Sequence, residues 1–164
     1  MRSASLFLAL TFAAASPVFA ESSDVTIPEA IQFGTSVDTM TDRLADLCTE
    51  APVRTIDPPR LPGVQDIQQQ IDCDGFDYMG EPRRAEFVFR DDALQLVWIL
   101  VDADDQERVI AAMREAYGEE VIENSAVVAF PEYRTAWRFE PPEVLFYSEE
   151  LRSAMEGFLG SLAE

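Results

Sequence analysis

Residues 85–101 read AEFVFRDDALQLVWILV, and this stretch decides the fold. Apolar side chains at every second position, Ala85, Phe87 and Phe89, are typical of a strand with one buried face, and the more continuous apolar run 94–101 is typical of a second strand. Between them, Arg90-Asp91-Asp92-Ala93 favours a turn, because Asp tolerates turn conformations. The stretch therefore predicts an antiparallel hairpin.

Further strand and helix signals flank this hairpin. Strands are expected at residues 67–73, 125–130, 134–139 and 143–147. Helices are expected from the N-cap Ser36 to near Cys48, from Asp102 or Asp104 to the C-terminal stop Gly118, and from the N-cap Ser148 along an apolar face ending at Leu162. This order predicts an α+β fold, with helices packed on one face of an antiparallel sheet and a closing C-terminal helix.

The second half of the chain echoes the first when it is shifted by fifty residues. Arg84 then aligns with Arg134, Phe87 with Trp137, and Leu96 with Phe146, a set that keeps both the alternation and the turn position. Within a single expected domain, 21–164, the match suggests two related helix-plus-strands units at about 32–101 and 102–164. The alternative is that two aromatic hairpins align by chance.

The first twenty residues predict an export signal. Arg2 supplies a positive start, Leu6 to Ala15 supplies an apolar stretch, and Val18-Phe19-Ala20 is a plausible cleavage site. Residues 1–20 are therefore expected to be a signal peptide, and the protein to be periplasmic or secreted. Glu21 stands where a lipidated cysteine would, and no later apolar run is long enough to span a bilayer, so neither a lipid anchor nor a transmembrane segment is expected.

Two cysteines, Cys48 and Cys73, follow the expected signal. An even number of cysteines in an oxidising compartment predicts a structural disulfide between them. A redox-active pair is the alternative, but the spacing is unlike Cys-x-x-Cys.

The charge balance and two missing residue types narrow the function. The chain has 31 acidic and 12 basic residues, a net charge of −19, which disfavours nucleic acid as a partner. It contains neither His nor Lys, so the usual neutral-pH base and Schiff-base chemistry are both missing. Residues 70–81 have the spacing of a calcium loop, but Gln70 replaces the first acidic ligand, and an acidic connection is favoured. We expect no catalytic residue, cofactor or metal.

The proline-rich segment 54–63 is the candidate partner-binding surface. Its extended chain would lose little conformational entropy on docking. The alternative is a stiff connection with no binding role. The candidate residues are Arg54, Ile56, Pro58, Pro59, Arg60 and Leu61.

Phe33-Gly34-Thr35-Ser36 opening a helix, Tyr117-Gly118 closing one, and the order of elements resemble exported bacterial domains of the fold shared by the β-lactamase inhibitory protein and small outer-membrane-assembly lipoproteins. The resemblance implies helices on one sheet face, with the other face or its loops offered to a protein. We therefore expect a soluble, non-catalytic protein-interaction module. One alternative is a carboxylate-dependent enzyme. Another is a carrier of small apolar ligands using the aromatic residues Phe87, Phe89, Trp98, Trp137, Phe139, Phe146 and Tyr147.

Overall fold

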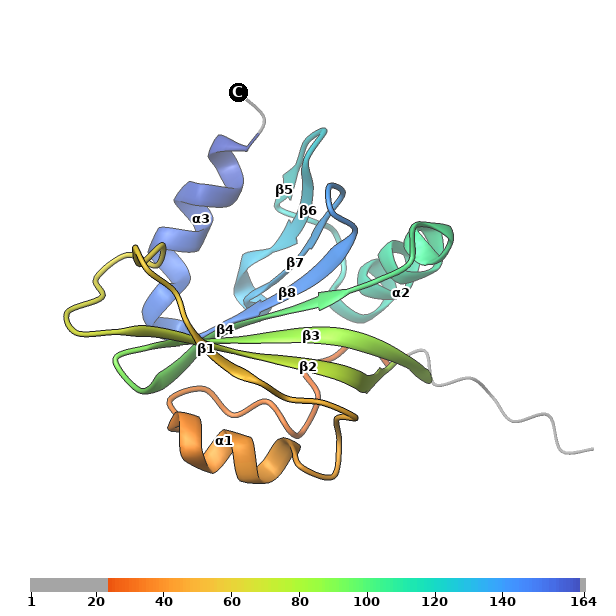
Figure 1. The fold of residues 1–164 in the computed structure, drawn as a ribbon. Coiled ribbons are helices and arrows are strands. Elements are labelled where there is room, and N and C mark those ends of the chain that lie inside the picture. The colour runs from red at the N-terminus through yellow and green to blue at the C-terminus, as the bar shows by residue number, and fades with distance from the viewer. Residues whose placement is uncertain (1–23, 163–164) are drawn as a thin grey trace, which may run out of the picture.

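The computed structural model describes residues 24–162, and they form one eight-stranded antiparallel sheet with three α-helices (Figure 1). The sheet order is β1-β2-β3-β4-β8-β7-β6-β5. The strands are β1 Val53–Thr55, β2 Gln68–Tyr78, β3 Glu81–Arg90, β4 Ala93–Leu100, β5 Ile122–Glu123, β6 Val127–Phe130, β7 Thr135–Arg138 and β8 Glu143–Tyr147. The helices are α1 Val37–Leu44, α2 Gln106–Tyr117 and α3 Arg152–Ser161. The α+β fold and the closing helix are thus confirmed. The predicted signal peptide lies outside the described residues.

The turn predicted at residues 90–93 joins β3 to β4. Asp91 and Asp92 adopt positive φ angles of 50° and 63°, as a two-residue hairpin turn requires. A second hairpin turn, not predicted from the sequence, lies at Met79-Gly80 between β2 and β3. Strand β2 reaches it by passing through a bulge at Gly75, so the acidic residues Asp72, Asp74 and Asp77 lie in a strand and not in a loop.

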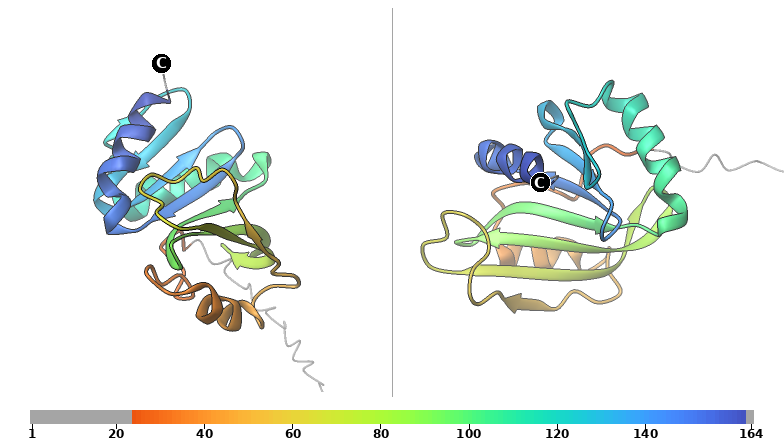
Figure 2. Two further views of the ribbon diagram at one scale, coloured as in Figure 1. Left: turned by 60° about the vertical axis from the view of Figure 1, so that its left-hand side comes forward. Right: turned by 90° about the horizontal axis from the view of Figure 1, so that it is seen from above.

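Helices cover both faces of the sheet. As predicted, α1 and α2 share one face, where Met40, Leu44 and Met113 pack on Phe87 and Phe146. Helix α3 lies on the opposite face, which differs from the prediction that all helices pack on one face (Figures 1 and 2). The cause is that the second side of the central strands is also apolar and needs a cover. Its buried residues include Val88, Leu96, Ala129, Leu145 and Tyr147.

The two predicted units meet at the centre of the sheet. Strands β4 and β8 pair with Leu96 opposite Tyr147 and Val97 opposite Phe146. A shift of fifty residues maps Leu96 onto Phe146 and Val97 onto Tyr147, so it converts each of these pairs into the other. Two units related by a two-fold axis would have this register. The duplication itself stays a prediction.

The hairpin turn at Asp91 and Asp92 also organises the chain around it. The Asp92 carboxylate accepts a hydrogen bond from the backbone N–H of Val37, the first residue of α1. The Asp91 carboxylate accepts from the backbone N–H groups of Asp66, Gln65 and Ile67, which lowers the pKa of Asp91. The turn therefore fixes one end of the loop that joins β1 to β2, residues 56–67.

The predicted disulfide is present. It joins Cys48, beyond the end of α1, to Cys73 in β2, with the two Cα atoms 5.4 Å apart. Cys73 is fully buried in the core beneath α1. Among the described helices, none combines the length and apolar character needed to cross a membrane.

Helix α3 carries two interior glycines that its surroundings do not require. A methyl group added at Gly157 or Gly160 would meet no heavy atom within 4 Å. Gly157→Ala and Gly160→Ala are each expected to raise the free energy of unfolding by about 0.5–1 kcal/mol, because alanine loses less backbone entropy in a helix. Urea denaturation measures this free energy. Gly118→Ala is the control with the opposite expected sign: Gly118 has a φ of 85°, so this substitution should lower the free energy of unfolding. Unchanged or lowered stability of both α3 variants would contradict the explanation.

Candidate functional site

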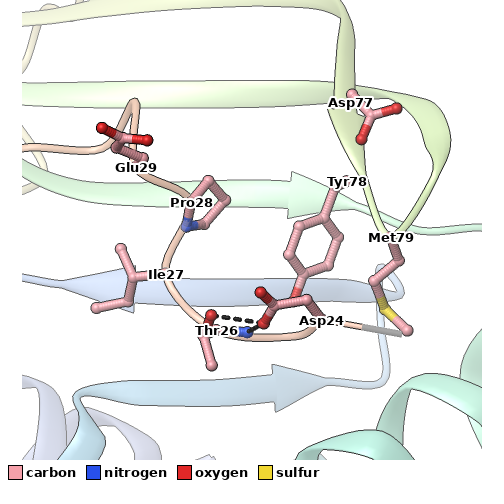
Figure 3. A pocket seen from close by; sticks show the side chains of 8 residues that line it. All are labelled: Asp24, Thr26, Ile27, Pro28, Glu29, Asp77, Tyr78 and Met79. Carbon is pink, nitrogen blue, oxygen red and sulfur yellow. Dashed lines mark hydrogen bonds between the residues drawn. The ribbon is translucent and has the colours of Figure 1, made fainter. Parts of the chain in front are cut away.

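One cavity lies between residues 24–29 and the end of β2, and its Asp24 carboxylate is already hydrogen-bonded within the chain (Figure 3). It has a volume of about 350 Å³. The Asp24 carboxylate accepts from the backbone N–H of Thr26 at 2.9 Å and from its hydroxyl at 2.5 Å, which lowers the pKa of Asp24. Figure 3 shows that Asp24, Glu29 and Asp77 do not converge. In residues 24–162, no cluster of three or more side chains is suited to hold a metal ion.

Another cavity, of about 570 Å³, is a groove between α3, the sheet and the β1–β2 loop. Its volume falls within the range typical of small-molecule sites. We call it the α3 groove, and its lining residues are Arg60, Leu61, Pro62, Gln68, Gln70, Glu86, Val88, Leu96, Trp98, Arg138, Ala154, Met155 and Phe158.

One wall of the α3 groove is apolar. Leu61 comes from the β1–β2 loop, Val88 and Leu96 from the sheet, and Met155 and Phe158 from α3. Phe158 is 40% exposed, so a large part of its side chain is open to solvent. This wall can bury an apolar group of a ligand.

Two buried glutamines of β2, Gln68 and Gln70, lie on the same sheet face as the apolar residues, with Gln70 paired to Val88 of β3. Gln68 accepts through Oε1 from the backbone N–H groups of Arg60 at 2.6 Å and Leu61 at 2.8 Å, and so holds the β1–β2 loop in place. Gln70 donates through Nε2 to the Asp72 carboxylate at 2.6 Å. Both side chains line the groove and are 4–5% exposed as residues.

Asp72 is held in its turn by two arginines. Arg54 Nε lies 2.7 Å and Arg84 3.5 Å from Asp72 Oδ2. Burial opposes ionisation of Asp72, but the hydrogen bonds from Arg54 and Gln70 prevail and lower its pKa. Asp72 is therefore a charged anchor that fixes Gln70.

Trp98 and Arg138 also line the groove, and Arg138 contacts the buried Glu143 outside the lining. The Arg138 guanidinium carbon lies 4.4 Å from the centre of the Trp98 ring, a cation–π contact, and Arg138 also forms an ion pair with Glu143. The Glu143 side chain is only 3% exposed. Burial raises the pKa of Glu143 to about 7, Arg138 opposes this change, and the nearby Glu86 carboxylate adds to it.

Glu86 is the acidic residue of the groove lining, and its ion pair is weak. Its carboxylate lies 3.9 Å from Arg84 Nε, and its side chain is 27% exposed. It lines the groove beside Trp98, which is opposite it on β4. Glu86 is therefore an acidic group available to a ligand.

The structure separates the predicted partner-binding residues. Arg60 and Leu61 line the α3 groove. Arg54 lies in the edge strand β1 and pairs with Asp72, whereas Pro58 and Pro59 are exposed and lie outside the groove lining. Ile56 is half-buried, and its backbone N–H donates to the Gln68 carbonyl.

Among the predicted aromatic residues, only Trp98 lines the groove. Phe87, Phe89, Trp137 and Phe146 are buried in the core beneath α1 and α2, with Phe139 packed against it. Tyr147 is buried beside α3. The aromatic residues thus form no common ligand-binding face.

Sequence reasoning missed Gln68, Gln70, Glu86, Arg138 and Glu143. One usable signal is the parity of β2, in which residues 68, 70 and 72 are all polar and share a face. A polar face on β2, which β3 separates from the apolar strand β4, indicates a region of the sheet that α3 leaves partly uncovered. No protein-family model, curated protein or solved structure matches the chain.

Proposed function

We propose that the protein is an exported, non-catalytic interaction module that binds a partner protein in the α3 groove. The supporting observation is the groove itself, which combines apolar residues, among them the exposed Phe158, with fixed polar groups. Arg60 and Leu61 of the proline-rich segment form part of its rim.

The charge of the chain indicates the kind of partner. A net charge of −19 repels nucleic acid and anionic surfaces and attracts basic proteins over long range. Such attraction speeds encounter, and the groove would then supply the specific contacts.

Export is proposed from the sequence of residues 1–20 and is supported by the disulfide. Disulfides persist in oxidising compartments and are rare in the cytosol. The partner is therefore sought among exported proteins.

A groove-filling substitution tests this function. Ala154 is exposed on α3 and lines the groove, so Ala154→Trp should occupy it. Ser153→Trp places the same side chain on the preceding residue of α3, which is exposed but does not line the groove. The purified disulfide-bonded protein is used as bait in the exported fraction of its own cells. We expect cross-linking to one protein to fall at least tenfold for Ala154→Trp and to stay unchanged for Ser153→Trp.

Two outcomes would overturn the proposal. In one, both variants retain the cross-linked protein equally, so that any partner binds elsewhere. In the other, native mass spectrometry finds a bound small molecule that Ala154→Trp displaces and Ser153→Trp does not. That result would favour a carrier function, in which the apolar residues of the groove bind a small apolar ligand.

A further inference from the structure

The hydrogen bonds of Gln68 and Gln70 settle which amide atom each offers to the α3 groove. Two N–H donors approach Gln68 Oε1, so the oxygen is committed and the Nε2 donor is left. Gln70 donates Nε2 to a carboxylate, so its Oε1 acceptor is left. Within the described part of the chain, no group hydrogen-bonds to Gln68 Nε2 or Gln70 Oε1.

This donor and acceptor are spaced like the backbone of an extended peptide. Gln68 and Gln70 lie two residues apart on one face of β2, a Cα separation of about 6.7 Å. On one edge of an extended peptide, C=O and N–H groups recur every second residue with the same repeat. A peptide could therefore donate to Gln70 and accept from Gln68 through residues two apart.

The remaining groove residues indicate the side chains of that peptide. Leu61, Met155 and Phe158 surround space for an apolar side chain. Glu86 lies at the other end, since β3 pairs with β2 so that Glu86 is opposite Asp72. A lysine or arginine of the ligand would find there a carboxylate whose one ion-pair partner within residues 24–162 is Arg84, at 3.9 Å.

We propose that the α3 groove binds an extended basic segment of its partner, with its backbone on Gln68 and Gln70, an apolar side chain against Phe158 and a cationic side chain on Glu86. This inference rests on the proposed function and names the chemistry of the partner. Because Gln68 and Gln70 are already fixed by Arg60, Leu61 and Asp72, little side-chain entropy is lost on binding.

Three capped synthetic peptides test the proposal. The first has five residues, all threonine except for one leucine and one lysine two positions later. The second carries glutamate in place of lysine, and the third has an ester in place of the leucine amide, which removes one N–H. Binding is followed by the emission of Trp98, since Trp137 is fully buried on the opposite face of the sheet. We expect the first peptide to bind at least fivefold more tightly than either of the others.

Two variants assign the contacts. Glu86→Gln should abolish the preference for lysine over glutamate, whereas Glu81→Gln, an exposed position at the start of β3, removes the same charge and should preserve it. Gln70→Leu should abolish the preference for amide over ester. Because leucine has a similar volume and Asp72 keeps Arg54, this variant should still fold, as circular dichroism can verify.

Equal binding of all three peptides, or tighter binding of the glutamate peptide, would overturn the inference. If cross-linking to the partner is still lost in Ala154→Trp in that case, the groove binds a protein by other chemistry and the proposed function survives. If the peptides behave as expected but Ala154→Trp leaves the partner bound, the proposed function fails at this site.

Discussion

Replacing Cys48 and Cys73 together by alanine is expected to lower the free energy of unfolding by about 3 to 4 kcal/mol, the largest effect of the changes considered. The disulfide closes a loop with a sequence separation of 25. Cutting it gives the unfolded chain back the entropy of that loop.

Urea denaturation under oxidising conditions measures this effect, and the reduced wild type is the matched control. Reduction breaks the same bond without removing the sulfur atoms from the buried position of Cys73. The difference between the reduced protein and the double alanine variant therefore isolates the loss of packing. A loss below about 1 kcal/mol on reduction would mean that the loop stays ordered in the unfolded chain and would contradict the prediction.

The second large effect is a fall in stability as the pH rises from 5 to 8, with Glu143 as its cause. The pKa of Glu143 is about 7 in the folded protein, against an ordinary value of 4.5. A raised carboxyl pKa means that the folded state holds its proton more tightly than the unfolded state. The resulting stabilisation is complete below about pH 4.5, is lost as the pH rises through 7, and amounts to about 3 kcal/mol.

Because the chain contains no histidine, this pH range is unusually free of other titrations. Glu143→Gln cannot ionise and should give a free energy of unfolding that stays nearly constant from pH 5 to 8. Glu86→Gln removes the neighbouring negative charge and should shift the wild-type curve to lower pH. A Glu143→Gln protein that keeps the wild-type pH dependence would exclude this carboxyl as its source.

The opposite dependence is expected in acid. Hydrogen bonds lower the pKa of Asp91, Asp105 and Glu149, so their contribution is present above their ordinary pKa values and is lost as the pH falls below them. Maximum stability should therefore lie near pH 5, between these carboxylates and Glu143.

The parts of the fold that could be predicted depend on local signals. The turn at Asp91 and Asp92, the end of α2 at Gly118 and the cap at Ser148 each involve a few consecutive residues. The disulfide could be predicted because there are only two cysteines. The turn and the helix ends are each determined within one short stretch of sequence. The two cysteines allow only one pairing.

The α3 groove could not be predicted because its contacts join distant segments. Arg138 of β7 meets Trp98 of β4 only because both strands pair with β8. Glu143 carries no unusual mark in the sequence, and its pKa depends on burial that the sheet creates. The acidic residues around Gly75 favour a turn, so the sequence did not predict that β2 continues past it. In the structure, β2 stays paired with β3 on both sides of Gly75.

The central position of β4 and β8 also bears on how the chain reaches its folded state. Strand β4 ends at Leu100, whereas its partner begins at Glu143. During synthesis, the first half of the chain therefore carries an apolar strand with an unpaired edge. Unpaired strand edges can pair with other chains and so promote aggregation. The second half relieves this hazard on arrival, so the central pairing makes completion of the chain the step that protects it from aggregation.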